Sequence, residues 1–122
     1  MTALILALFL SLSAQANVLS KCQTVGPNSS VTASFVPEDG AVVYLVKLSG
    51  AATMATSSRG SILWDGTIIE AWTVDKVVEY PDNEPAFSLT GDGVKALQIK
   101  LENLSATVTY MLCGTLFYKL GT

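Results

Sequence analysis

Short apolar stretches separated by turn-forming residues recur along most of this chain of 122 residues. The clearest turn signals are Pro37-Glu38-Asp39-Gly40, Asp65-Gly66 and Gly91-Asp92-Gly93. In such turns proline restricts φ and glycine supplies a positive φ. Turn signals spaced about 8–12 residues apart are typical of antiparallel sandwiches and barrels. We therefore predict an all-β fold, a single small β-sandwich or jelly-roll-like barrel.

The stretches between these turns have the period of β-strands. Asp65-Gly66 lies between two apolar runs, which is a strong signal for a hairpin. Ala106 to Leu120 predicts a long final strand, with a bend at Gly114 because glycine inside a strand often marks a bulge. In Val94 to Glu102 every second side chain is apolar, which predicts that one face turns to the core through Leu97, Ile99 and Leu101.

The composition excludes several classes of function. Histidine is absent, which removes the commonest general base and the commonest metal ligand. Charged residues make up only 14% of the chain, the net charge is −3, and the basic residues are scattered singly. Nucleic-acid binding needs a clustered basic surface, so we expect no nucleic-acid partner. We also expect no cofactor, no metal site and no catalytic residues.

The first sixteen residues, Met1 to Ala16, begin with a wholly apolar run and end in Ala14-Gln15-Ala16. The small-x-small ending is typical of a signal peptide, but no basic residue precedes the run. The run is also short for a membrane span, which needs roughly 20 apolar residues. We expect residues 1–20 to form a retained apolar arm and residues 21–122 to form the β-sandwich domain. Cleavage of the arm, or its use as a membrane anchor, remains the alternative.

Two cysteines, Cys22 and Cys113, lie far apart in the sequence. In an exported protein they would form a disulfide between the N-terminal segment and the last strand. In a reducing cytoplasm they would remain separate thiols that pack as small apolar groups. The sequence leaves this choice open.

Two tryptophans, Trp64 and Trp72, lie in the region of the predicted hairpin. Exposed, they would form an aromatic platform for a carbohydrate or another ligand. Buried, they would belong to the core. Acidic residues fall mostly on turns and on outward faces of strands, which indicates solvated edges rather than a catalytic pair.

Three features together give the chain its likeness to a known class. They are the small all-β body, the N-terminal arm with Ser13-Ala14-Gln15-Ala16, and the closing stretch from Asn103-Leu104-Ser105-Ala106-Thr107-Val108-Thr109 to Gly114-Thr115-Leu116-Phe117-Tyr118. In these the chain resembles tailed-phage virion proteins that decorate or cement a capsid. The resemblance implies a homo-oligomer in the virion that binds the major capsid protein or sister subunits. The expected interface residues are Leu4, Ile5, Leu6, Leu8, Phe9 and Leu10.

Two other non-enzymatic functions fit the same features. One is a secreted or cell-surface β-sandwich module that binds a ligand or carbohydrate. The other is a pilin-like filament subunit whose N-terminal segment forms the filament core. A membrane would be involved only if that segment is an anchor.

Overall fold

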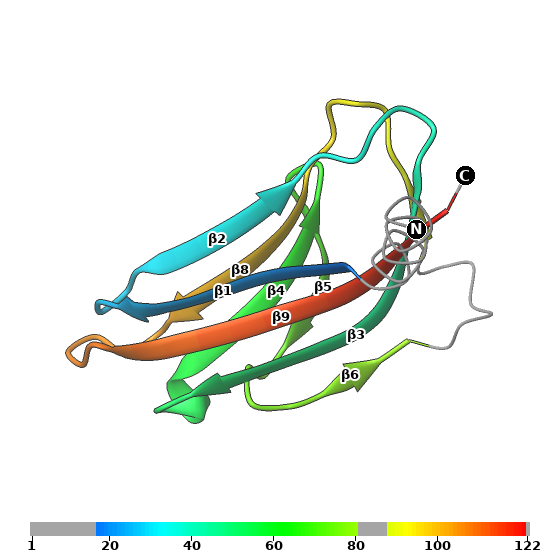
Figure 1. The fold of residues 1–122 in the computed structure, drawn as a ribbon. Coiled ribbons are helices and arrows are strands. Elements are labelled where there is room, and N and C mark those ends of the chain that lie inside the picture. The colour runs from blue at the N-terminus through cyan, green and yellow to red at the C-terminus, as the bar shows by residue number, and fades with distance from the viewer. Residues whose placement is uncertain (1–16, 81–87, 122) are drawn as a thin grey trace, which may run out of the picture.

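The computed structural model describes residues 17–80 and 88–121, and these form a small β-sandwich of two antiparallel sheets (Figure 1). Sheet A has the order β1-β9-β3-β6, and β7 also pairs with β3. Its strands are β1 (Asn17–Val25), β3 (Val42–Ala52), β6 (Val78–Glu79), β7 (Ser88–Thr90) and β9 (Tyr110–Gly121). Sheet B has the order β2-β8-β4-β5, with β2 (Ser30–Phe35), β4 (Ser58–Trp64), β5 (Thr67–Trp72) and β8 (Leu97–Asn103). A short 3-10 turn, η1 (Ala55–Ser57), precedes β4. The prediction of an all-β sandwich is confirmed.

The core lies between the two sheets and is built by alternation along their strands. In β8, Leu97, Ile99 and Leu101 are fully buried, while the residues between them reach the outer face. This inward face is as predicted. Sheet A supplies its own inward set, which includes Val43, Leu48, Leu112 and Leu116, all with no exposed surface.

The hairpin between β4 and β5 turns at Asp65-Gly66, as predicted. Asp65 has φ of 52° and Gly66 has φ of 82°. Positive φ at both central residues defines the type I′ turn, whose twist matches that of paired strands. Aspartate tolerates this conformation, and glycine adopts it without a Cβ penalty.

The last strand differs from the prediction in two ways: it does not begin at Ala106, and it has no bulge at Gly114. Strand β9 begins at Tyr110, because the hydroxyl of Ser105 accepts hydrogen bonds from the N–H groups of Thr107 and Val108 and holds that stretch as a loop. Gly114 does not mark a bulge, since β9 keeps its register with β1 throughout. Glycine is needed there for space, because a Cβ would lie 2.7 Å from Cδ2 of Leu101.

The sandwich includes residues that we had assigned to the N-terminal arm. Strand β1 begins at Asn17 and pairs with β9 along its whole length, so residues 17–20 belong to sheet A. Residues 1–16 lie outside the described part of the chain. Within the described ranges no helix is long and apolar enough to cross a membrane.

Candidate ligand-binding site on sheet A

The site begins with a bulge in β3. Leu45 pairs with Tyr118 and Lys47 pairs with the next residue of β9, Phe117, so Val46 is an extra residue in β3. Without this extra residue, strict alternation would turn Lys47 toward the core. The bulge instead places Lys47 on the outer face and returns Leu48 to the core, where it is fully buried.

The bulge brings charged and aromatic side chains together on the outer face. Nζ of Lys47 lies 4.9 Å from the centre of the Phe117 ring, which is a cation–π contact. Glu79 of β6 is the register partner of Lys47 on its other side. The N–H of Tyr80 donates to the carbonyl of Val46 at 2.9 Å and so holds the segment after β6 against the bulge.

A pocket of about 390 Å³ opens beside the bulge, where β3, β6 and the C-terminal end of β9 meet. Phe117 reaches it from the outer face of β9. Tyr118 and Tyr80 also border it, but they are only 7% and 5% exposed, and the ring of Tyr118 stacks on Phe35 of sheet B with ring centres 5.4 Å apart. Among the described residues the lining is Asn17, Val46, Lys47, Glu79, Tyr80, Phe117, Tyr118 and Lys119.

Both tyrosines that border the pocket have a pKa above the usual value for a phenol. Burial, and then the Glu70 carboxylate that accepts the Tyr80 hydroxyl at 3.0 Å, raise the pKa of Tyr80. Burial also raises the pKa of Tyr118. On the outer face the pocket combines the Phe117 ring with the side chains of Lys47 and Glu79. These groups suit a ligand that has an apolar ring face and hydroxyl or carboxylate substituents.

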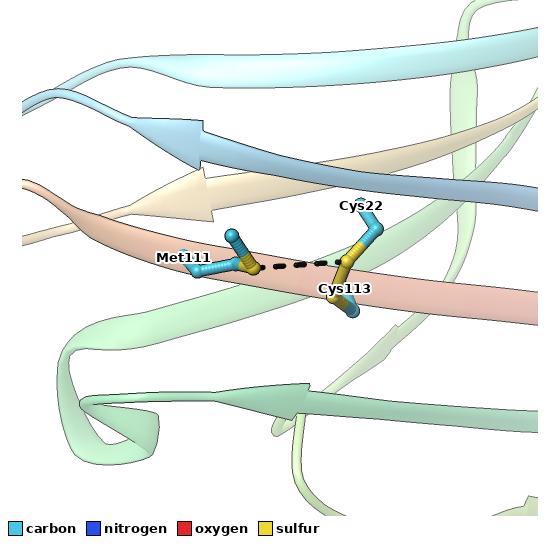
Figure 2. Close-up of a disulfide and its surroundings, with 3 residues drawn as sticks. All are labelled: Cys22, Met111 and Cys113. Carbon is cyan, nitrogen blue, oxygen red and sulfur yellow. Dashed lines mark hydrogen bonds between the residues drawn. A yellow bond between two sulfur atoms is a disulfide. The ribbon is translucent and has the colours of Figure 1, made fainter.

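A disulfide joins Cys22 to Cys113 on the same outer face, farther along β1 and β9 from the pocket (Figure 2). The two residues are direct register partners, so the bond connects adjacent strands. Cys22 is exposed, and its Sγ lies 3.9 Å from Sδ of Met111, which is 49% exposed. Thus both cysteines, whose pairing the sequence left open, are oxidised and neither is a nucleophile.

The structure corrects the suggestion of a tryptophan platform. Trp72 is only 6% exposed, because its ring fills the space left by the missing side chain of Gly60. Trp64 is half-buried and packs against the core. The pocket on sheet A contains neither residue.

The acidic residues do not gather into a metal site within residues 17–80 and 88–121. No group of three or more His, Cys, Asp or Glu side chains there could hold a metal ion. Asp92 has a local role instead: its Oδ1 accepts the N–H groups of Val94 and Lys95, and these hydrogen bonds lower the pKa of the Asp92 carboxyl.

The residues expected to contact a capsid lie outside the described part of the chain. They are Leu4, Ile5, Leu6, Leu8, Phe9 and Leu10. Capsid decoration and pilin-like assembly therefore stay predictions. Conversely, the pocket residues Lys47, Glu79 and Phe117 were not predicted. The available signal was Lys47, a charge that interrupts an apolar strand and so indicates a break in alternation.

Comparison with known proteins gives little resemblance. No protein-family model matches the chain, and no curated protein matches it. Among solved structures the chain is similar to PliG from Aeromonas hydrophila, described as a periplasmic lysozyme inhibitor of g-type lysozyme. The two are 9% identical, the match covers 90% of each chain, and the TM-score is 0.45. A likeness at this level carries no inference about function.

Proposed function

We propose that this protein is an exported, non-enzymatic β-sandwich module that binds a carbohydrate in the sheet A pocket. The observation that carries the proposal is the pocket itself, in which the ring of Phe117 lies beside Lys47 and Glu79. Its volume of about 390 Å³ is within the range of small-molecule sites.

The chemistry of the lining supports a sugar as the ligand. The apolar C–H face of a sugar ring packs against aromatic side chains, and its hydroxyl groups need donors and acceptors nearby. The side chains of Lys47 and Glu79 lie next to each other on the rim and supply both kinds of group. Because Lys47 already lies over Phe117, the ring and the ammonium group present one combined surface.

The disulfide supports export. Bonds of this kind persist in oxidising compartments and are rare in the cytosol. In addition, Ala14-Gln15-Ala16 has the small-x-small pattern that is typical of a signal-peptide cleavage site. The proposal therefore takes the cleaved alternative for residues 1–16 in place of a retained arm.

The residue types of the pocket support a binding role without catalysis. Among the described residues, the lining contains no serine, threonine or cysteine that could act as a nucleophile. The chain has no histidine to serve as a base.

A glycan array, followed by calorimetric titration of the best ligand, tests the binding site. Phe117→Ala should weaken binding about tenfold or more, as expected for loss of an aromatic anchor. Ile68→Ala is the matched control, because Ile68 is an exposed apolar residue of sheet B, 56% exposed. Equal loss in both variants, or no glycan bound by the wild type, would contradict the proposal.

Intact mass and thiol labelling of the protein from its native cells test export. We expect a chain that begins at Asn17 and has no thiol that reacts without prior reduction. A full-length chain with two reactive thiols would show that the protein is not exported.

A further inference from the structure

The edges of the two sheets are protected to different degrees. An edge strand presents backbone N–H and C=O groups that can pair with another chain. Proteins protect such edges with short strands, bulges or inward-pointing charges. In the described part of the molecule the edge strands are β1, β6 and β7 in sheet A, and β2 and β5 in sheet B.

Four of these strands carry a known protective feature. Strands β6 and β7 have only two and three residues. Strand β5 contains a bulge, since Ile62 pairs with Glu70 and Leu63 pairs with Ile68. Strand β1 turns Lys21 toward the inner side, where it pairs with Gly114 of the buried face of β9.

Strand β2 has none of these features. Its sequence, Ser30–Phe35, contains no charge, proline or glycine, and it pairs with β8 in one unbroken register. No backbone group of β2 bonds to a described residue outside that ladder. Figure 1 shows β2 in cyan at the margin of its sheet, with β1 beside it. Strand β2 is thus a regular strand whose second side is hydrogen-bonded to no described strand.

Two lysines and one paired carboxylate lie near this edge. On the outer face, Lys100 of β8 is the register partner of Thr32. The nearest carboxylate on that face, Glu102, is held by Arg59 at 3.2 Å. On the inner side Lys21 is half-buried on the neighbouring edge strand. Neither Lys21 nor Lys100 forms an ion pair with any described residue.

We propose that the β2 edge binds an extended, acidic segment of a partner protein, which adds a strand to sheet B. In such pairing the backbone supplies affinity and the alternate side chains supply specificity. Apolar residues of the partner segment would pack beside the half-buried Ala33 and Phe35, and its acidic residues would face Lys100. A second copy of this chain is disfavoured, because a two-fold β2–β2 pair would bring two Lys21 side chains together along the same open side.

The test uses two fluorescent peptides with opposite charge, acetyl-(Val-Glu)4 and acetyl-(Val-Lys)4, with the whole protein. We expect the Val-Glu peptide to bind and to slow amide hydrogen exchange in β2. An analogue with N-methyl groups along one edge should not bind, because it lacks the N–H donors for the ladder. Lys100→Glu should weaken the Val-Glu peptide about tenfold and strengthen the Val-Lys peptide. Lys76→Glu, a reversal at an exposed lysine in the turn after β5, is the control and should change neither.

Several results would overturn this proposal. They are equal binding of both peptides, no binding, or protection of β1 or β5 in place of β2. Protection of β2 that rises with protein concentration in the absence of peptide would show that a second copy is the occupant. The glycan site is on the other sheet, so Phe117→Ala should leave peptide binding unchanged, and either proposal can fail alone.

Discussion

On the outer face of sheet A, the paired side chains of β1 and β9 are apolar, hydroxyl and sulfur groups. They form the cross-strand pairs Val18–Phe117, Ser20–Thr115, Cys22–Cys113 and Thr24–Met111. On the outer face of sheet B, most pairs of β2 and β4 with β8 are polar or ionic, and Leu63–Gln98 is the exception. The polar and ionic pairs are Ser30–Glu102, Thr32–Lys100, Ser34–Gln98, Arg59–Glu102 and Ser61–Lys100. Between the two sheets the buried core is mainly apolar.

This difference shows that one alternating pattern builds the core and leaves two unlike surfaces free for other roles. Sheet A has a covalent bond between adjacent strands and a pocket beside a bulge. Sheet B has an exposed ion pair and a regular open edge. We therefore expect sheet A to contribute more to stability per side chain on its outer face than sheet B does.

Removal of the disulfide should have the largest effect on stability. The double variant Cys22→Ser/Cys113→Ser should lose about 3–5 kcal/mol of the free energy of unfolding, because the bond closes a long loop in the unfolded chain. The measurement is denaturant unfolding under non-reducing conditions. Ser20→Ala/Thr115→Ala, at a neighbouring pair of the same strands, is the control and should lose less than about 0.5 kcal/mol per site. Equal losses in the two double variants would show that the disulfide contributes no more to stability than the neighbouring pair does.

Asn103→Ala should have the next largest effect, because Asn103 connects the two sheets. Its Nδ2 donates to the carbonyls of Val25 at 2.9 Å and Val108 at 2.8 Å, and its Oδ1 accepts from the N–H of Ser105 at 2.8 Å. Loss of these partners in a buried site should cost about 2–3 kcal/mol. Gln98→Ala, which removes an exposed hydrogen bond to Ser34, should cost below about 0.5 kcal/mol in the same denaturation assay.

Alkaline pH should destabilise the pocket end of sheet A. Tyr80 has a raised pKa in the folded state, so between pH 10 and that pKa the unfolded chain loses a proton that the folded chain keeps. Stability from this group is complete below pH 10 and decreases above it, by up to about 1.4 kcal/mol per pH unit. In Tyr80→Phe the slope of unfolding free energy against pH above 10 should be smaller. Glu70→Gln should reduce the slope only in part, since burial is the larger cause. An unchanged slope in both variants would exclude Tyr80 as the titrating group.

The ion pair of sheet B should have the smallest effect. Arg59 is 52% exposed at its side chain and lies 3.2 Å from Glu102. A double-mutant cycle with Arg59→Ala and Glu102→Ala should give an interaction of about 0.2–1 kcal/mol, which decreases as salt is added. A coupling energy of several kcal/mol that is insensitive to salt would contradict the expectation that the outer face of sheet B contributes less to stability than that of sheet A.

The strands and turns were largely predictable because they depend on local chemistry. The alternation in β8 and the positive φ values at Asp65 and Gly66 follow from residue types that are neighbours in the sequence. The pocket was not predictable in this way. It depends on one extra residue, Val46, that reverses the direction of Lys47, and alternation by itself does not show where such a shift occurs.

The sequence by itself determined the fold class, the hairpin turn and the inward face of β8, because strand period and turn chemistry act over a few residues. Tertiary structure decided which distant residues meet. Pairing of β1 with β9 placed Cys22 beside Cys113, and packing on Gly60 placed Trp72 in the core. The meeting of β3, β6 and β9 assembled the pocket. These outcomes depend on long-range strand order, which local pattern does not specify.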